Sequence, residues 1–200
     1  MNSGKADAQP AAAPPPSPGG PLQADYEEFR RLLRKALKNI LWPYFRTPVA
    51  CRPGGGNATA VRERLFCYEL YHQLRCACDK ADFGYWLGGE LDKDKHPIIR
   101  GGPIPDLVVH EPGDMDHNLC VLEVKPISGS RPGFKKDVNT LTTFTTNYAY
   151  HAGILLVYGD RDSAETVIRS KVGTDLQALR TNRVFVLWIR NAQSEPVELQ

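Results

Sequence analysis

Two acidic side chains and a lysine lie on two stretches of the sequence that are expected to form neighbouring strands. Gly102 to His110 has the pattern of a short apolar strand with Asp106 near its start. Asn118 to Pro126 has the pattern of a second strand, which carries Glu123 and Lys125. Because side chains alternate between the two faces of a strand, Glu123 and Lys125 are expected on one face. If the strands are neighbours, Asp106 lies beside Glu123.

Such a group of side chains has a definite chemistry. Two carboxylates at one point repel each other unless a cation lies between them. An ammonium group next to them suits a metal-bound water or a developing negative charge on phosphate. The alternative for Asp106 is an acid that caps a turn after Pro105. The alternative for Glu123 and Lys125 is an ion pair on a solvated edge strand, which the apolar run around them disfavours.

The elements that must position these residues follow from apolar periodicity. The pattern predicts the order helix, helix, strand, strand, strand, helix, strand, helix, strand. These elements are expected at residues 25–42, 59–79, 83–91, 102–110, 118–126, 134–148, 153–158, 162–180 and 184–189. A hairpin-type loop at 111–116 predicts an antiparallel pair. An antiparallel meander followed by helix-strand crossovers gives an α/β fold, a mixed sheet flanked by helices.

The chain of 200 residues is long enough for one α/β domain with a buried core. Residues 1–23 are rich in Ala, Pro and Gly and are expected to be a disordered tail without a secretory signal. Residues 24–191 are expected to form the single domain, with an added N-terminal helix. Residues 192–200 are expected to be a polar tail. No apolar run reaches the length of a membrane span, so no membrane partner is expected.

Charge and cysteine content narrow the function only a little. The formal net charge of +2 is weak support for a nucleic-acid partner and excludes nothing. The odd count of 5 cysteines, with Cys120 in a strand typical of a core, favours reduced thiols and a cytoplasmic protein. Zinc is disfavoured because Cys67, His72, Cys76 and Cys78 are spread around one helix.

The order of these motifs resembles a known family. A helix that carries Glu69 precedes a three-strand meander with Pro105-Asp106 on its second strand. Glu123-Val124-Lys125 follows on the third strand, and then come a helix and a buried strand. Over about residues 59–189 this pattern resembles the PD-(D/E)XK nuclease superfamily, which has the restriction-endonuclease-like fold.

The resemblance implies a role for each matching residue. Asp106 and Glu123 would bind Mg²⁺ or Mn²⁺, since hard divalent cations prefer oxygen ligands. The carbonyl of Val124 would add a ligand, and Glu69 would complete the metal shell. Lys125 would position the attacking water or help to deprotonate it. The implied reaction is hydrolysis of a phosphodiester by in-line attack of water, with DNA as the expected substrate.

Basic residues suggest where a nucleic acid would lie. Arg30, Arg34 and Lys38 form one row on the first helix. Lys135 and Lys136 begin the helix after the third expected strand, with Asp137 and Asn139 beside them as further polar candidates. The alternative for the basic row is a solvated helix face.

Four functions remain open. The first is a metal-dependent endonuclease or exonuclease, which a homodimer would equip to cut both strands of a duplex. The second is a catalytically silent nucleic-acid-binding or scaffold subunit of a larger defence or repair complex. The third is a subunit that cleaves only inside a complex, where its partners supply substrate recognition. The fourth is a structural α/β protein whose ion pair mimics the motif.

Overall fold

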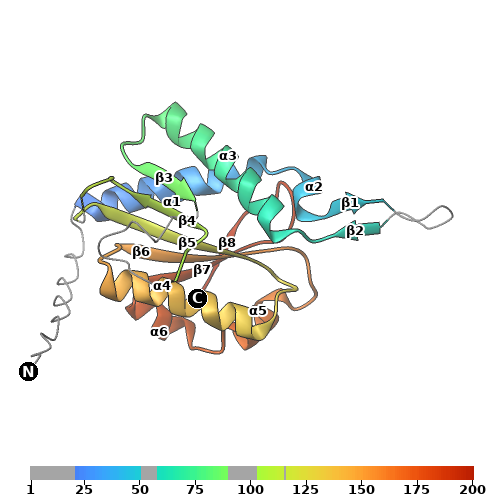
Figure 1. The fold of residues 1–200 in the computed structure, drawn as a ribbon. Helices are drawn as coiled ribbons and strands as arrows, with labels where there is room; N and C mark the ends of the chain where they lie inside the picture. Colours follow the sequence, from blue (N-terminus) through green and yellow to red (C-terminus); the bar gives the residue numbers. More distant parts are fainter. Residues whose placement is uncertain (1–20, 51–57, 90–102, 115) are drawn as a thin grey trace, which may run out of the picture.

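A six-stranded mixed sheet runs through the middle of the molecule, with helices on both of its faces (Figure 1). The computed structural model describes residues 21–50, 58–89, 103–114 and 116–200. The helices are α1 (Pro21–Asn39), α2 (Trp42–Phe45), α3 (Glu63–Ala81), α4 (Arg131–Asn147), α5 (Ala164–Val172) and α6 (Leu176–Thr181). The strands are β1 (Thr47–Val49), β2 (Ala58–Ala60), β3 (Trp86–Gly89), β4 (Leu107–His110), β5 (Asn118–Pro126), β6 (Ala152–Tyr158), β7 (Val184–Ile189) and β8 (Val197–Leu199).

The strand order in the large sheet is β3-β4-β5-β6-β7-β8. Strands β3, β4 and β5 form an antiparallel meander. Strands β5, β6 and β7 are parallel, and α4 and then α5 with α6 make the crossovers that parallel neighbours require. The structure therefore confirms the expected meander followed by helix-strand crossovers. Strand β8 closes the far edge, antiparallel to β7.

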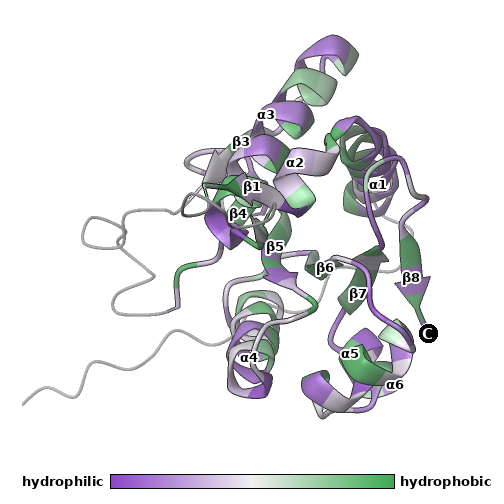
Figure 2. Ribbon diagram, turned by 90° about the vertical axis from the view of Figure 1, so that its right-hand side faces the viewer, coloured by the Kyte–Doolittle hydropathy of each residue, from purple (hydrophilic) through white to green (hydrophobic). Residues whose placement is uncertain are grey.

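Each face of the sheet buries its own apolar cluster. Leu122 and Val124 of β5 pack in the cluster that contains the buried residues of α1 and α3. Val121 of the same strand packs in the opposite cluster, with residues of α4, α5 and α6. Figure 2 shows the apolar sides of the helices turned toward the sheet. The alternation expected for β5 is therefore present, and it assigns each of its side chains to one helix layer.

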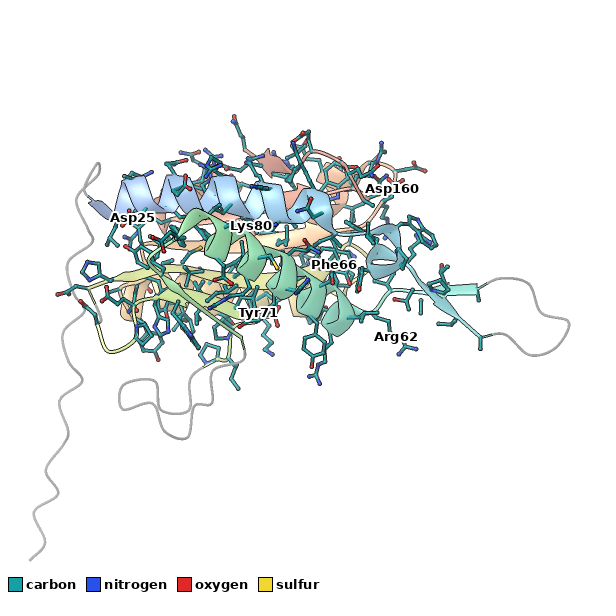
Figure 3. All side chains as sticks on the ribbon, turned by 90° about the horizontal axis from the view of Figure 1, so that it is seen from above. Asp25, Arg62, Phe66, Tyr71, Lys80 and Asp160 are labelled. Carbon is teal, nitrogen blue, oxygen red and sulfur yellow. The ribbon has the colours of Figure 1, made fainter. Side chains whose placement is uncertain are left out.

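Helices α1 and α3 lie side by side over one face of the sheet (Figure 3). The centre of this layer is an aromatic group. The rings of Phe66 and Tyr158 stack at a centroid distance of 3.9 Å, 5° from parallel, and the edge of Phe45 packs against both. This stack holds α3 against β6. It therefore also positions the end of α3 that approaches β5.

The N-terminal half of the fold differs from the expectation at one connection. The helix expected at 59–79 begins at Glu63, because residues Ala58–Ala60 form β2. Strand β2 pairs with β1, although the sequence predicts that the Pro/Gly-rich segment 47–57 is a loop. The two strands project from the body of the molecule beside the first turn of α3 (Figure 1). Each strand has only three residues, so apolar periodicity does not reveal the pair.

The C-terminal half differs at two points. The helix expected at 162–180 is divided into α5 and α6: Gly173, with φ of +69°, ends the first, and the Asp175 side chain accepts a bond from Gln177 N–H at the start of the second. Residues 192–200 are not simply a polar tail, since Val197–Leu199 form β8. At the other end, residues 21–23 belong to α1 rather than to the expected tail.

Some expectations fall outside the described residues. These are the tail at 1–20, the part of the expected Pro/Gly-rich loop at 51–57, the end of the first expected strand at 90–91, a charged turn expected at 92–96, and the start of the second strand at 102. The described cysteines are free thiols: Cys67, Cys76, Cys78 and Cys120. Among the described helices, none is long and apolar enough to cross a bilayer.

The aromatic stack makes a stability prediction. Phe66→Ala removes a fully buried ring and is expected to lower the free energy of unfolding by about 3–5 kcal/mol. Urea denaturation followed by circular dichroism measures this loss. Tyr68→Ala, on the exposed side of the same helix, is the control and should change stability by less than about 0.5 kcal/mol. Equal losses in the two variants would contradict the packing of α3 on β6.

Candidate active site

The candidate site lies where β4 begins and its neighbour β5 continues. Leu107, the first residue of β4, pairs with Leu122. Asp106 is one residue earlier, so it lies opposite Glu123, just outside the strand ladder. Its Oδ2 accepts the backbone N–H of Val124 at 2.7 Å. The Asp106 carboxylate therefore accepts the bond that a backbone carbonyl would accept if β4 extended further. The N–H of Val124 on β5 is thus paired.

Glu123 is buried beside Asp106. Its side chain is on the face of β5 that also carries Val121, and the residue is only 5% exposed. The two carboxyl groups hydrogen-bond to each other. Burial, followed by the negative charges of Asp106 and Asp137, raises the pKa of Glu123 to about 9. Burial also raises the pKa of Asp106, against the lowering effect of the Val124 N–H. Without a cation, Glu123 is therefore protonated at neutral pH.

Lys125 is the next residue along the same face of β5, and it joins the two helix layers. Its Nζ lies 3.1 and 3.0 Å from the two carboxylate oxygens of Glu63, at the start of α3. The same Nζ lies 3.1 Å from Oδ2 of Asp137 on α4. Burial opposes the charged form of Lys125, but the bonds to Glu63 and Asp137 outweigh it and raise its pKa. The ammonium group is therefore charged and held from both sides.

Asp137 is the buried acid of α4. The side chain of Ser130 accepts the N–H of Gly133 at the start of this helix. Phe134 and Leu141, one turn to either side of Asp137, pack into the core. Asp137 shares this inward face, and burial raises its pKa to about 6 despite the opposing charge of Lys125. The sequence had placed Asp137 only among loose candidates on this helix.

Glu69, for which a metal-binding and catalytic role was expected, does not join this cluster. Its Oε1 accepts a bond from Gln73 at 2.7 Å, and its carboxylate hydrogen-bonds to the phenol of Tyr44. Glu69 lies six residues after Glu63 on α3. Six residues turn a helix by about 600°, which is one full turn and about 240° more, so the two side chains leave α3 in different directions. The acid of α3 that does reach Lys125 is Glu63.

Sequence reasoning missed Glu63. A signal was present, since acidic residues favour the first turn of a helix, where the dipole stabilises negative charge. The expected helix began four residues too early, at Thr59, and so this acid was not recognised as a first-turn residue. The β1–β2 pairing sets the true start of the helix.

The carbonyl of Val124 is on the same edge of β5 as its N–H, since both groups of one residue in a strand face the same neighbour. That edge is the one that Asp106 occupies. Asp106, Glu123 and the Val124 carbonyl thus offer oxygen donors from two strands, a set that fits Mg²⁺ or Mn²⁺. Mg²⁺ needs only one or two protein carboxylates, because water and substrate phosphates supply the other ligands. The raised pKa of Glu123 marks a place where a cation would relieve repulsion.

The basic row of α1 is engaged elsewhere. Arg30 forms ion pairs with Glu198 and Glu27, and the backbone carbonyl of Pro196 accepts a bond from Arg34 at 2.7 Å. Lys38 pairs with Glu195. The row therefore holds the C-terminal segment at the β8 edge of the sheet, three strands from β5. The nucleic-acid contacts expected for these residues stay a prediction, and they would compete with the acidic and carbonyl oxygens that already bond to the three side chains.

Lys135 and Lys136 have a different setting. Both are exposed on α4. They line an open hollow of about 480 Å³ together with Pro103, Pro132, Asn139, Thr140 and Thr143. Since Asp137 follows them directly and faces Lys125, these two lysines lie on the outward side of the helix that borders the site. Their expected contact with a nucleic acid stays a prediction.

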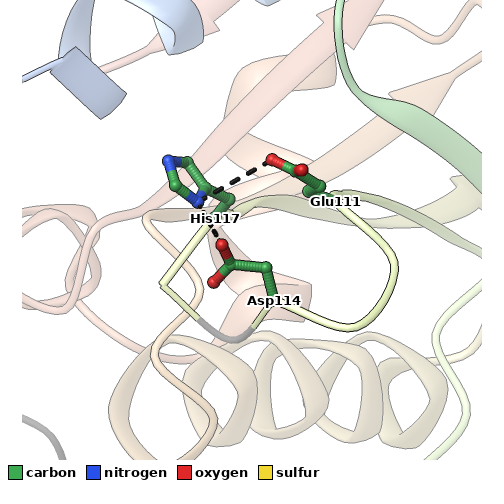
Figure 4. Close-up of side chains that lie close together, drawn as sticks. All are labelled: Glu111, Asp114 and His117. Atoms are coloured by element: carbon green, nitrogen blue, oxygen red, sulfur yellow. Dashed lines mark hydrogen bonds and ion pairs between the residues drawn. The ribbon is translucent and has the colours of Figure 1, made fainter.

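A second group of potential ligands lies in the turn between β4 and β5 (Figure 4). Nδ1 of His117 lies 2.8 Å from Oδ2 of Asp114 and 3.8 Å from Oε2 of Glu111. Each of these three side chains offers one possible ligand atom, and the three atoms all lie within 4.8 Å of one another. The bond between His117 and Asp114 raises the pKa of the former and lowers that of the latter. These contacts close an exposed turn.

Comparisons with protein-family models, with curated proteins and with solved structures gave no match. Function is therefore inferred from the cluster around Asp106 alone. Its chemistry is specific: two carboxyl groups side by side, a charged ammonium on the same strand face, and two further acids that hold the ammonium. Such an arrangement can bind a hard divalent cation and place a positive charge next to it.

The buried carboxyl pair predicts a pH-dependent stability. The pKa of Glu123 is about 9 in the folded protein against 4.5 as the ordinary value. Between these pH values the folded protein keeps a proton on Glu123 that the unfolded chain has released. The free energy of unfolding therefore falls as the pH rises from 4.5 to 9. Glu123→Gln has no such proton to lose, so this fall in stability is absent in the variant. In urea denaturation with EDTA, the variant should match the wild type near pH 4.5 and exceed it at pH 8–9 by roughly 1–3 kcal/mol.

Glu69→Gln is the matched control, because its carboxylate lies outside the cluster and hydrogen-bonds to Gln73. Its difference from the wild type should not grow between pH 4.5 and 9 in the same way. If Glu123→Gln were less stable than the wild type at pH 8–9, the carboxyl pair would not be the strained group described above.

Proposed function

We propose that the protein is a metal-dependent phosphodiesterase, a nuclease that hydrolyses nucleic acid, with DNA as the first substrate to consider. The observation that carries the proposal is the contact between the buried carboxyl group of Glu123 and the half-buried one of Asp106. The N–H of Val124 holds the Asp106 carboxylate at the start of β4, and Lys125 is on the same face of β5 as Glu123. Two acids in such contact lower the stability of the folded protein when nothing offsets their burial and repulsion. A cation bound between them would offset both effects.

The fold supports the same proposal. An acid-bearing helix (α3), an antiparallel meander (β3, β4, β5), a helix (α4) and a parallel strand (β6) follow in the order of the PD-(D/E)XK pattern. We extend the proposal to a restriction-endonuclease-like fold on this basis. Glu63 stands in for Glu69 as the acid from α3, although its carboxylate is bonded to Lys125.

The proposed mechanism assigns each residue a task. Asp106, Glu123 and the Val124 carbonyl would hold Mg²⁺ or Mn²⁺, which lowers the pKa of a bound water and neutralises charge on the phosphate. The Val124 N–H fixes the orientation of Asp106. Lys125 presents a charged ammonium that stabilises negative charge on the phosphate during attack. Glu63 and Asp137 hold the Lys125 Nζ in place.

A second function has an observation in its favour. The ammonium of Lys125 is already paired with two carboxylates, an arrangement that also suits a structural ion pair between helix layers. A catalytically silent subunit that binds nucleic acid, or acts as a scaffold in a larger defence or repair complex, would keep this arrangement without turnover. The free thiols support a place in the reducing cytoplasm for either function. A homodimer would let one site act on each strand of a duplex.

Cleavage assays with matched variants test the proposal. The purified protein is incubated with supercoiled plasmid, linear duplex DNA, single-stranded DNA and RNA, with Mg²⁺, Mn²⁺ or EDTA. The wild type should cleave at least one substrate with metal only. Asp106→Asn and Lys125→Ala should each lower the rate by about 100-fold or more, because the first weakens the metal site and the second removes the positive charge beside the reacting phosphate. Glu69→Gln should keep the wild-type rate.

The pattern across variants separates the readings. Cleavage that persists in both Asp106→Asn and Lys125→Ala contradicts the proposed site. Silence in the wild type with retained affinity for DNA supports the binding or scaffold subunit. Thermal unfolding of each variant shows whether a lost rate comes from the site or from a lost fold.

A further inference from the structure

A cavity adjoins the carboxyl pair on the side of α3. It has a volume of about 460 Å³, within the range of small-ligand sites. Its lining combines charged and aromatic side chains with the edge of the meander: Glu63, Arg64, Cys67, Tyr68, Tyr71, Gly89, Asp106 and Leu107. Since Asp106 is part of the wall, a ligand in this cavity would lie directly next to the candidate metal site.

Two tyrosines form the aromatic part of this wall. Tyr68 and Tyr71 are three residues apart on α3, so both project from one side of the helix. The ring of Tyr71 is half-buried, and its hydroxyl donates to the carbonyl of Leu87 on β3 at 3.4 Å. Figure 3 shows Tyr71 midway along α3, beyond Phe66 from the helix start. Tyr68 is 61% exposed, which is high for a large ring.

The charges around the cavity differ from one end to the other. Asp106 and Glu63 are at the end near Lys125, where a cation and a phosphate would lie. Arg64 and Tyr68 are exposed residues of α3 in the same lining. The cavity therefore combines acidic oxygens, which a cation could bridge to a phosphate, with an exposed aromatic ring. A nucleotide has the two matching parts, a phosphate and a flat base.

We propose that this cavity binds one unpaired base of a single-stranded DNA segment, stacked on Tyr68, next to the phosphate that Asp106 and its cation would hold. The inference rests on the proposed nuclease function and adds its substrate class. Both faces of a base within a duplex are covered by its neighbours, so a tyrosine ring reaches only a base that has left the stack. Stacking on an aromatic side chain tolerates every base, which favours single strands without a sequence requirement.

An abasic-site scan tests the inference without turnover. Fluorescein-labelled single-stranded oligonucleotides, each lacking one base at a successive position, are titrated with protein in Ca²⁺, and fluorescence anisotropy gives the dissociation constants. For the wild type, one position should weaken binding about 5- to 150-fold, the effect of one stacked base. Tyr68→Ala should weaken binding to the intact strand similarly and should lose the sensitivity at that position.

Two variants make the test specific. Tyr68→Phe keeps the ring and should keep both the affinity and the sensitive position. Leu41→Ala changes an apolar side chain that is also 61% exposed but lies outside this cavity, and it should behave as the wild type. Circular dichroism of each variant controls for folding, which an exposed position should not disturb.

The outcomes separate this inference from the proposed function. A flat scan for the wild type, or a position that stays sensitive in Tyr68→Ala, overturns the base site even if the protein cleaves DNA. A sensitive position that disappears only in Tyr68→Ala supports the base site even if no cleavage is found. Equal affinity for duplex and single strand also overturns it, because a paired base cannot reach the ring.

Discussion

The hydrogen bond from the Val124 N–H to the Asp106 carboxylate is the contact on which the site depends. Strand β4 begins one residue after Asp106, so β5 would otherwise have an unpaired donor in the interior at this point. A side-chain carboxylate in place of a backbone carbonyl satisfies that donor and brings a charge to the end of the ladder. The same register places Asp106 opposite Glu123. The register of β4 and β5 therefore brings the two acids together, with Asp106 in the bend just before β4.

The local charge balance follows from this contact. Glu123 and Asp106 lie together with little solvent, and Asp137 adds a third acid nearby, so the pKa of Glu123 rises to about 9. Lys125 is the one cation that the described part of the chain brings within ion-pair distance of Asp137, and it is shared with Glu63. Its charge is thus drawn toward the helices rather than toward the carboxyl pair. A divalent cation at the pair would supply the positive charge that Lys125 does not.

Local sequence patterns predicted the strands and helices of the site, but not which helix residues complete it. Alternation along β5 was sufficient to place Glu123 and Lys125 on one face, and the short turn before it was sufficient to place Asp106 alongside. The sequence offered Glu69 rather than Glu63 as the acid of the helix, because β1 and β2, which precede the true start of α3, are too short for apolar periodicity to reveal. The partners of the basic row of α1 were not predictable either. They come from a C-terminal segment more than 150 residues away, which joins the sheet as β8.

The most direct measurement is an anomalous difference map from crystals of the protein soaked in Mn²⁺, recorded near the manganese absorption edge. A cation site at the start of β4 predicts a peak between the carboxylates of Asp106 and Glu123, within coordination distance of the Val124 carbonyl. The turn with Glu111, Asp114 and His117 is an internal comparison in the same map. A peak at that turn alone, or a map in which Asp106 and Glu123 still hydrogen-bond to each other with no ion between them at saturating Mn²⁺, would contradict the metal-dependent site.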